Sequence, residues 1–112
     1  MKSVYVSYPS DFESKEFRKE LAKIRDIKFI FPNHSYNSKN LIRKASFLVA
    51  EVSKPSTGVG IEVGWADSFD VPVIFVFRKK SRISSSLKII SRNFIKYDKI
   101  EQIPSLLEAY LR

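Results

Sequence analysis

The sequence predicts an α/β domain of three layers, in which helices cover both faces of a mainly parallel, five-stranded sheet. Segments with strand character alternate five times with segments of helical periodicity. Two of the strand segments, Phe47–Val52 and Val71–Phe77, are almost continuously apolar, which is typical of parallel strands buried on both faces. The length of 112 residues, 44% of them apolar, fits one domain over residues 1–112.

The first elements follow from a change of periodicity near residue 10. Val4–Tyr8 alternates and is rich in β-branched and aromatic residues, so it is predicted to be a strand. Ser10 or Asp11 can then cap a helix over Phe12–Arg25, whose apolar residues recur at helical spacing. Ile27–Phe31 is the second strand, and the proline that follows ends it.

A polar loop and a short helix connect this strand to the middle of the sheet. Asn37 or Ser38 can cap the helix, which is predicted to run through Lys44. The strand Phe47–Val52 follows, and its apolar run is interrupted only by an acid, Glu51. The alternation of strand and helix therefore continues through the middle of the chain.

The second half of the chain repeats the same pattern. Ser56 or Thr57 can cap a helix over Gly58–Phe69, and the apolar strand Val71–Phe77 comes next. Three elements complete the chain: a loop that leads into a helix within residues 81–91, a strand over Phe94–Tyr97, and a helix over Ile100–Leu111.

Composition excludes several classes of protein. Without cysteine and with a single histidine, His34, the chain has no disulfide scaffold, thiolate zinc site or multi-histidine metal site, and we expect neither metal nor cofactor. No apolar run reaches the ~20 residues that span a bilayer, and the N-terminus lacks the apolar region of a signal peptide, so a cytoplasmic protein is expected. The net charge of +8 favours anionic partners such as nucleotides, although scattered basic residues are weak evidence for nucleic-acid binding.

Ligands of parallel α/β sheets bind at the carboxyl ends of the strands. Three predicted loops lie there, Tyr8–Asp11, Ser53–Gly58 and Arg78–Ser86, and they hold most of the serines. Gly58 and Gly60 let the backbone approach a ligand, and free N–H groups there could bind a nucleotide's phosphate or sugar. The segment lacks the GxGxxG pattern and the lysine of an NTP phosphate loop, so it supports neither of those sites.

Glu62 is the candidate for chemistry in this region. It is predicted to lie near the first turn of its helix, where the dipole favours the ionised carboxylate and an apolar pocket disfavours it. An ionised, partly desolvated carboxylate is a suitable nucleophile or ion-pair stabiliser at an anomeric carbon. The alternative is a solvent-facing residue that only stabilises the dipole, which residue type alone favours by roughly three to one.

Residues 45–66, ASFLVAEVSKPSTGVGIEVGWA, strongly resemble the nucleoside 2-deoxyribosyltransferase family, especially its 2'-deoxynucleoside 5'-phosphate N-hydrolase branch, whose signature is AD-apolar-AEV-x-x-PSLGVGYELG-x-A. VPVIFVFR, residues 71–78, and SVY, residues 3–5, extend the resemblance over most of the chain. The family has a Rossmann-like or flavodoxin-like α/β fold. The resemblance implies hydrolysis of the N-glycosidic bond of 2'-deoxynucleoside 5'-monophosphates, which gives free base and deoxyribose 5-phosphate, by a homodimer.

The resemblance also implies roles for individual residues. Glu62 matches the catalytic glutamate that attacks C1' of the deoxyribosyl group, and Tyr5 matches the tyrosine that supports it. Ser56 matches the serine that binds the 5'-phosphate. Ser86, or Ser85 with a one-residue shift, matches a serine supplied across the dimer to the neighbouring site. Taken singly, each serine would be interpreted as a loop or helix-cap residue.

The sequence departs from the family pattern at the second acid. The family has an aspartate 24 positions before its glutamate, which assists protonation of the leaving base, and that position is Ser38 here. A serine cannot supply a carboxyl proton or a negative charge. Asn37 and Asn40 are near but are not acids, and Asp11 could approach from the loop after the first strand.

Two further departures concern the loops around the predicted site. The first loop reads SYPSD in place of a glycine-serine phosphate loop with an arginine, and Ser7 and Ser10 could replace part of it. The segment at residues 32–40 is shorter than in the family, which predicts a more open base pocket. His34 and Tyr36 are candidates to stack on or protonate a base, although a plain loop residue is the commoner interpretation of His34 by roughly two to one.

Three functions therefore compete. The first is the N-glycosidase, or a transferase that passes the deoxyribosyl group to another base. The second is a non-catalytic nucleotide-binding module that kept Glu62 and lost the second acid at Ser38. The third, a nucleic-acid binder that uses Lys79, Lys80 and Arg82, lacks an aromatic–basic platform. A Glu62 side chain that pointed into bulk solvent would argue against every active-site assignment.

Overall fold

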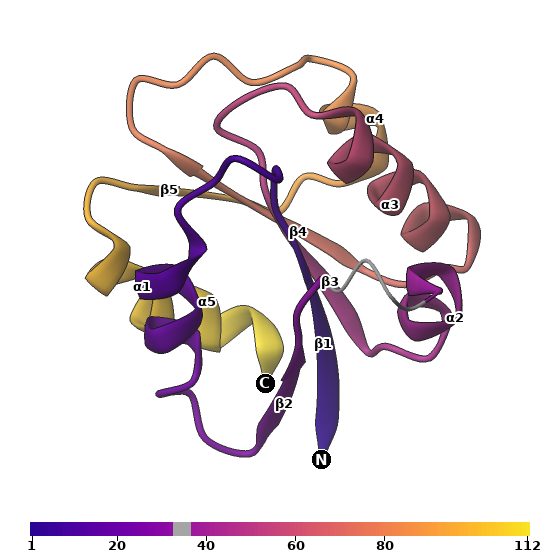
Figure 1. Cartoon of the computed structure of the whole chain (residues 1–112), viewed down its shortest axis with the longest axis horizontal. Coiled ribbons are helices and arrows are strands. Elements are labelled where there is room, and N and C mark those ends of the chain that lie inside the picture. Colours follow the sequence, from indigo (N-terminus) through magenta and orange to yellow (C-terminus); the bar gives the residue numbers. More distant parts are fainter. Residues whose placement is uncertain (33–36) are drawn as a thin grey trace.

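Five strands form one sheet in the computed structural model, which describes residues 1–32 and 37–112 (Figure 1). They are β1 (Lys2–Ser7), β2 (Ile27–Ile30), β3 (Phe47–Glu51), β4 (Val73–Arg78) and β5 (Phe94–Tyr97). Their order across the sheet is β2-β1-β3-β4-β5, and each neighbouring pair is parallel. The predicted α/β fold class is confirmed, with the doubly wound strand order of flavodoxin-like sheets.

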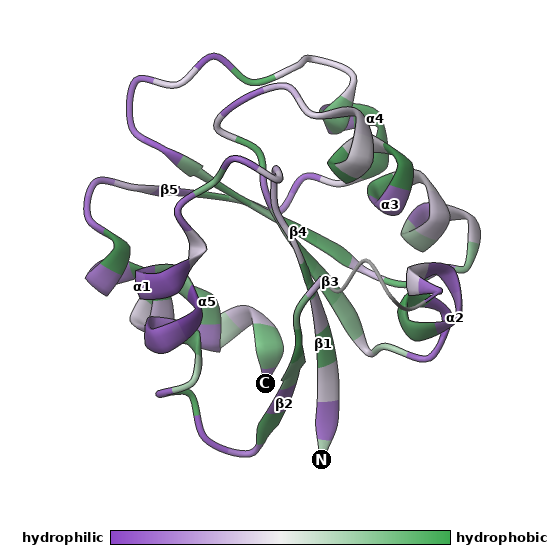
Figure 2. Cartoon of the chain, viewed as in Figure 1, coloured by the Kyte–Doolittle hydropathy of each residue, from purple (hydrophilic) through white to green (hydrophobic). Residues whose placement is uncertain are grey.

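Helices cover both faces of this sheet and complete three layers (Figure 1). On one face lie α1 (Ser14–Leu21), the 3₁₀ turn η1 (Ile100–Gln102) and α5 (Ile103–Leu111). The other face carries α2 (Ser38–Arg43), α3 (Thr57–Ser68) and α4 (Leu87–Ile90). Each face buries its own apolar core, and Figure 2 shows the hydrophobic strands between helices and loops that carry the hydrophilic residues.

The helix α1 begins later than predicted, at Ser14 instead of Phe12. Neither Ser10 nor Asp11 caps it, and the side chain of the N-cap residue, Glu13, makes no capping hydrogen bond. Aromatic packing explains the difference, because the ring of Phe12 packs against two neighbouring aromatic rings before the helix begins.

The same helix also ends before the predicted residue, Arg25. The N–H groups of Lys23 and Ile24 donate to carbonyls three residues back, so the last turn is tighter than an α-helix. Asp26 then adopts a left-handed φ of 65°, which turns the chain into β2. Ile24 stays buried, so the apolar face predicted from the sequence is kept.

The other predicted elements are present, with most ends shifted by one or two residues. Asn37 caps α2, since its side chain accepts from the Lys39 N–H at 3.1 Å, and Ser56 caps α3, since its hydroxyl oxygen accepts from the Val59 N–H at 3.3 Å. The helix predicted within residues 81–91 is the single turn α4. None of the helices in the described part of the chain has the length and apolar character needed to cross a bilayer.

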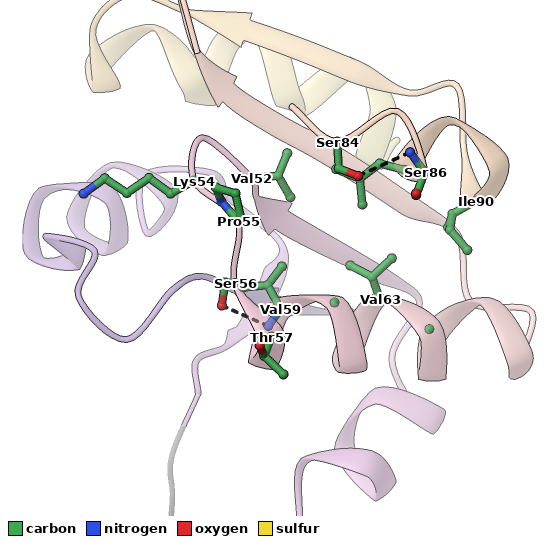
Figure 3. A pocket seen from close by; sticks show the side chains of 13 residues that line it. Val52, Lys54, Pro55, Ser56, Thr57, Val59, Val63, Ser84, Ser86 and Ile90 are labelled. Carbon is green, nitrogen blue, oxygen red and sulfur yellow. Dashed lines mark hydrogen bonds between the residues drawn. The ribbon is translucent and has the colours of Figure 1, made fainter. Parts of the chain in front are cut away.

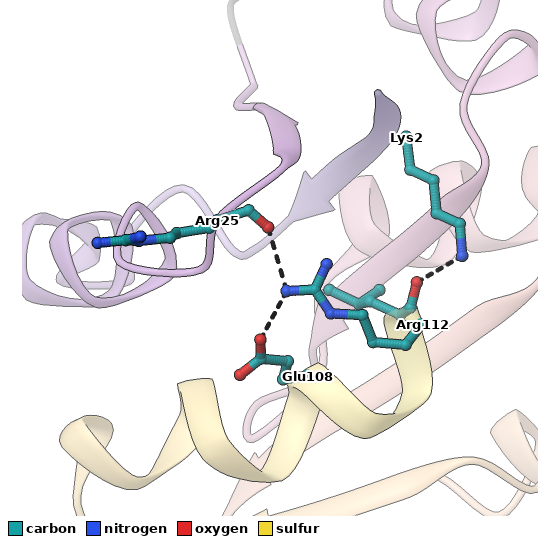
Figure 4. Close-up of polar contacts among 5 residues, drawn as sticks. Lys2, Arg25, Glu108 and Arg112 are labelled. Atoms are coloured by element: carbon teal, nitrogen blue, oxygen red, sulfur yellow. Dashed lines mark hydrogen bonds and ion pairs between the residues drawn. The ribbon is translucent and has the colours of Figure 1, made fainter.

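The two ends of the chain are tied together at the amino edge of the sheet (Figure 4). The ammonium of Lys2 donates to the Leu111 carbonyl at 2.7 Å. The guanidinium of Arg112 donates to Glu108 at 2.6 Å and to the Arg25 carbonyl at 3.2 Å. These contacts anchor α5 to β1 and to the turn before β2. Because the strands are parallel, their carboxyl ends share the opposite edge, where the loops with the candidate residues lie.

Candidate active site

A cleft of about 590 Å³ opens at the carboxyl edge of the sheet, between the loop after β1 and the start of α3. It lies where the strand order reverses, since β1 has β2 on one side and β3 on the other. Ligands of doubly wound sheets bind at this position. The cleft brings together these predicted site residues: Tyr5, Ser10, Ser38, Ser56, Gly58 and Glu62.

Glu62 is half-buried and lines this cleft, so its side chain does not point into bulk solvent. It lies in the second turn of α3 rather than the first, because the helix begins at Thr57. Two hydroxyl groups hold its carboxylate: Tyr5 Oη donates to Oε2 at 2.6 Å and Ser7 Oγ donates to Oε1 at 2.7 Å. Each carboxylate oxygen therefore keeps a lone pair for another contact.

The strand β1 supplies both hydroxyl groups because Tyr5 and Ser7 are two residues apart and point to the same face of the sheet. Both are buried, with 1% and 0% of their surface exposed. Burial raises the pKa of the Tyr5 phenol above its ordinary value, and the hydrogen bond to Glu62 and the charge of that carboxylate raise it further. The phenol therefore stays protonated and donates a hydrogen bond to Glu62.

Ser38, at the position of the family's second acid, also lines the cleft. Its side chain lies close enough to the Tyr5 hydroxyl to lower the pKa of that phenol, against the larger effects of burial and Glu62. Asp11 does not replace the missing acid, because it lines a separate cleft on the α1 side. Its carboxylate oxygen Oδ2 lies 3.9 Å from Nζ of Lys54. Glu62 is therefore the only acid among the described residues that line this cleft.

The predicted phosphate ligands divide into three groups. Ser10, Ser56 and Gly58 line the cleft. Ser7 does not, because its buried hydroxyl donates to Glu62, so the structure gives it a supporting position instead. The hydroxyl oxygen of Ser56 accepts from the backbone of α3, which leaves its O–H free to donate to a ligand.

Gly60 and Ser86 form the third group, in a neighbouring groove of about 540 Å³ between α3 and α4 (Figure 3). Ser56 lines both this groove and the cleft. On the opposite wall, the backbone N–H of Ser86 donates to the hydroxyl of Ser84 at 3.3 Å. Within one copy of the chain, Ser86 is therefore separate from the cleft that holds Glu62.

Aromatic side chains line part of the cleft, and sequence reasoning did not assign them to it. Tyr8, Phe12 and Trp65 all lie there, although Trp65 could equally have been a core or an interface residue from its periodicity. Because Trp65 follows Glu62 by three residues, the two share a face of α3, and this spacing could have placed it. The two predicted base contacts, His34 and Tyr36, lie outside the described residues.

Comparison with known sequences finds similarity to a curated protein over part of the chain. No protein-family model matches the chain. Over 73 residues, the chain is 32% identical to a curated protein of Syntrophotalea carbinolica named "Putative 2'-deoxynucleoside 5'-phosphate N-hydrolase 1". The match covers 62% of this chain and 51% of that protein, so the chain spans about half the length of the curated relative it matches.

Solved structures share the fold at low sequence identity. The Clostridium botulinum CMP N-glycosidase BcmB matches with a TM-score of 0.71 and 16% identity over 97% of this chain and 99% of that chain. A Burkholderia pseudomallei protein described as a "Putative pilus assembly-related protein" matches with a TM-score of 0.65 and 8% identity, over 99% and 87% of the two chains. Such identities show the fold alone. The curated relative carries the name of the branch that residues 45–66 resemble.

Proposed function

We propose that this chain, which resembles the 2'-deoxynucleoside 5'-phosphate N-hydrolases, is an enzyme that hydrolyses the N-glycosidic bond of 2'-deoxynucleoside 5'-monophosphates. The products are free base and deoxyribose 5-phosphate. The observation that carries the proposal is the half-buried carboxylate of Glu62, which Tyr5 and Ser7 hold in the cleft. A fixed carboxylate with free lone pairs is the nucleophile that retaining glycosidases use.

Glu62 acts in two steps. First, one of its carboxylate oxygens bonds to C1' of the sugar while the C1'–N bond breaks, and the electron pair leaves with the base. The base takes its proton from water in the cleft, because the hydroxyl of Ser38 is not an acid. A second water then attacks C1', Glu62 leaves as the free carboxylate, and the proton that this water loses goes to the hydroxide left when the base was protonated. The hydroxyls of Tyr5 and Ser7 align the carboxylate and stabilise its charge when it leaves.

The 5'-phosphate binds at the start of α3. The free O–H of Ser56 and the N–H groups of the first turn, at Thr57 and Gly58, are donors without partners inside the helix. Ser10, in the loop after β1, lines the same cleft. The net charge of +8 also attracts an anionic substrate, so a phosphorylated nucleoside is favoured over a bare one.

The base lies against aromatic rings that line the cleft. Tyr8, Phe12 and Trp65 offer flat, apolar surfaces there, and such rings pack well against a planar heterocycle. Stacking of this kind distinguishes bases weakly, since every base presents a flat face. We therefore expect several deoxynucleoside monophosphates to be accepted, with differences in rate between them.

Release of free base tests the proposal. Each deoxynucleoside monophosphate is incubated with the wild type and with Glu62→Gln, and the base is quantified by chromatography. Loss of the nucleophile should lower base release by roughly 10³-fold or more while nucleotide binding persists. Asp67→Asn, an exposed acid on the same helix, is the matched control and should release base at the wild-type rate. A wild type that releases no more base than Glu62→Gln would contradict the proposal.

Two other functions use the same cleft. A transferase would pass the sugar to a second base instead of water, so adding a different free base should produce a new nucleotide. A non-catalytic nucleotide-binding module is favoured by Ser38, because Glu62 is the only acid among the described residues of the cleft. Equal nucleotide affinity of the wild type and Glu62→Gln, without any base release, would support this module.

We also propose that the chain forms a homodimer across the groove between α3 and α4 (Figure 3). Apolar side chains from both helices line the groove, and the nearby Ile89 is 86% exposed. Exposed apolar surface of this kind suits a second copy of the chain. Because Ser56 borders both the groove and the cleft, two-fold pairing would bring Ser86 or Ser85 of one copy towards the cleft of its partner.

A further inference from the structure

A second glutamate, Glu51, lies at the end of β3 and is held in the same chemical manner as Glu62. Its carboxylate accepts three hydrogen bonds: from the Ser53 N–H at 2.8 Å, from the Ser53 hydroxyl at 2.8 Å, and from the Tyr97 hydroxyl. Unlike Glu62, it is 0% exposed. It borders the separate cleft on the α1 side, but it has no exposed surface of its own for direct contact with a substrate, so any effect it has is exerted through the residues that it holds.

Burial of a carboxylate is costly unless donors surround it. Tyr97 meets that need from β5, two strands away from Glu51. Burial raises the pKa of the Tyr97 phenol, and the hydrogen bond to Glu51 and the charge of that carboxylate raise it further. The phenol therefore stays protonated and donates a hydrogen bond to Glu51. The guanidinium of Arg78 lies 5.1 Å from the centre of the Tyr97 ring. The cluster therefore links the carboxyl ends of β3, β4 and β5.

The cluster holds Ser53, the residue that begins the connection between β3 and α3. Its backbone N–H and its hydroxyl donate to Glu51, and its hydroxyl oxygen accepts from the Arg78 N–H at 2.8 Å. Only Lys54 and Pro55 separate it from Ser56, which caps α3 and lines the cleft. The position of Ser56 and of the first turn of α3 therefore depends on how Ser53 is fixed.

We propose that Glu51 is a positioning residue that fixes the connection from Ser53 to Ser56 and, through it, the recognition of the substrate's 5'-phosphate. The inference rests on the proposed function for the identity of the ligand. It separates the two glutamates by accessibility: Glu62 faces the cleft and acts on the sugar, whereas Glu51 faces the strand ends and acts through the backbone.

Affinities for paired ligands test the inference in a protein that cannot turn them over. In a Glu62→Ala background, binding of a deoxynucleoside monophosphate and of the same deoxynucleoside without phosphate is measured with and without Glu51→Gln. The change replaces one of the two accepting carboxylate oxygens with an NH₂ group, which donates. Affinity for the monophosphate should fall roughly tenfold, because Ser53 loses a hydrogen bond to the charged carboxylate of Glu51. Affinity for the nucleoside should not change.

The matched control is Glu20→Gln. Glu20 is also a buried glutamate, 6% exposed, but it lies on α1, pairs with Lys23 and is not among the residues that line the cleft. Glu20→Gln should leave the affinities for the monophosphate and for the nucleoside unchanged. Equal weakening of monophosphate and nucleoside by Glu51→Gln, or no weakening of either, would overturn the inference.

Hydrogen exchange provides a readout that does not depend on any ligand. In Glu51→Gln, the amides of residues 53, 54, 56 and 57 should exchange faster, while the amides of β3 at residues 48–50 should keep their protection. If Glu51→Gln does not fold, Tyr97→Phe removes one donor and should show the same pattern more weakly. Unchanged exchange at 53–57 in a folded variant would contradict the role of Glu51. A wild type that binds no nucleotide would contradict the proposed function instead.

Discussion

Tyr5 and Tyr97 lie on different faces of the sheet, and the hydroxyl group of each donates a hydrogen bond to a glutamate. In both residues burial raises the pKa of the phenol first, and the hydrogen bond to the glutamate and its charge add to that effect. The fold therefore favours the neutral phenol at both positions. At the residue scale, each tyrosine holds a carboxylate in place only as long as it stays protonated.

Alkaline titration checks this statement. Because the folded-state pKa of each phenol lies above the ordinary value of 10.0, the stability that it contributes is fully present below pH 10.0 and is lost as the pH rises through the folded-state pKa. Phenolate absorbance should show both tyrosines ionising late, together with unfolding. Tyr5→Phe and Tyr97→Phe should each remove one late-ionising phenol. Removal of an early-ionising phenol by either change would show that the assignment is wrong.

Tyr5→Phe also has a predicted effect on the proposed reaction. It removes one of the two donors that align and stabilise Glu62, while Ser7 keeps the other. A hydrogen bond to a charged group is worth about 1.5–3 kcal/mol, so base release should fall by roughly tenfold to hundredfold. Tyr110→Phe, an exposed tyrosine on α5, is the control and should leave the rate unchanged. A wild-type rate in Tyr5→Phe would remove Tyr5 from the proposed mechanism.

At the scale of elements, α3 depends on its cap. Ser56→Ala removes the acceptor for the Val59 N–H and should lower the unfolding free energy by about 1 kcal/mol and Tm by about 4 °C. It should also weaken binding of a deoxynucleoside monophosphate more than that of the nucleoside. Ser68→Ala serves as the control in calorimetry and binding assays, because the Ser68 hydroxyl lies at the other end of the helix and donates to the Trp65 carbonyl. Equal losses in both variants would argue against a special role for Ser56.

The elements could be predicted from the sequence because their signals are local. Alternation between strand and helix periodicity identified the five described strands, and the side-chain caps of α2 and α3 are two of the predicted candidates, Asn37 and Ser56. The cap of α1 was predicted wrongly because residue type favoured Ser10 or Asp11, whereas packing of the Phe12 ring delays the helix. Packing between aromatic rings has no periodic signature that a short sequence window could reveal.

The contacts of the candidate site differ in how far the sequence predicts them. Periodicity alone places Tyr5 and Ser7 on one face of β1, but only the family resemblance joined Tyr5 to Glu62. The contact between Glu51 and Tyr97 could not be predicted, because it depends on how β5 pairs with β4 and joins residues 46 positions apart. Long-range pairing of this kind leaves no pattern within either strand.

At the scale of the whole molecule, the proposed dimer makes a prediction about a glycine. Gly64 lines the groove between α3 and α4, and a Cβ built there meets no atom within 4 Å. Gly64→Leu should therefore fold well as a single copy, with up to about 1 kcal/mol gained from helix propensity. It should block a second copy from the groove, so sedimentation should show a shift from dimer to monomer.

A matched change on the opposite face provides the control for this prediction. Leu106→Ala alters an exposed apolar residue on α5, which packs on the other side of the sheet, and should leave the oligomeric state as it is. A dimer that survives Gly64→Leu would place the contact between copies elsewhere on the molecule.

The contact between Lys2 and Leu111 has a practical consequence for attaching tags, fusion partners or solid surfaces to the protein. Both ends of this chain lie at the amino edge of the sheet (Figure 1). The cleft that Glu62 lines opens at the carboxyl edge. An affinity tag, a fluorescent fusion or a tether to a solid surface, joined at either end, would therefore emerge away from the cleft. Immobilised protein should keep its nucleotide-facing side open to solution, which suits surface-based binding measurements.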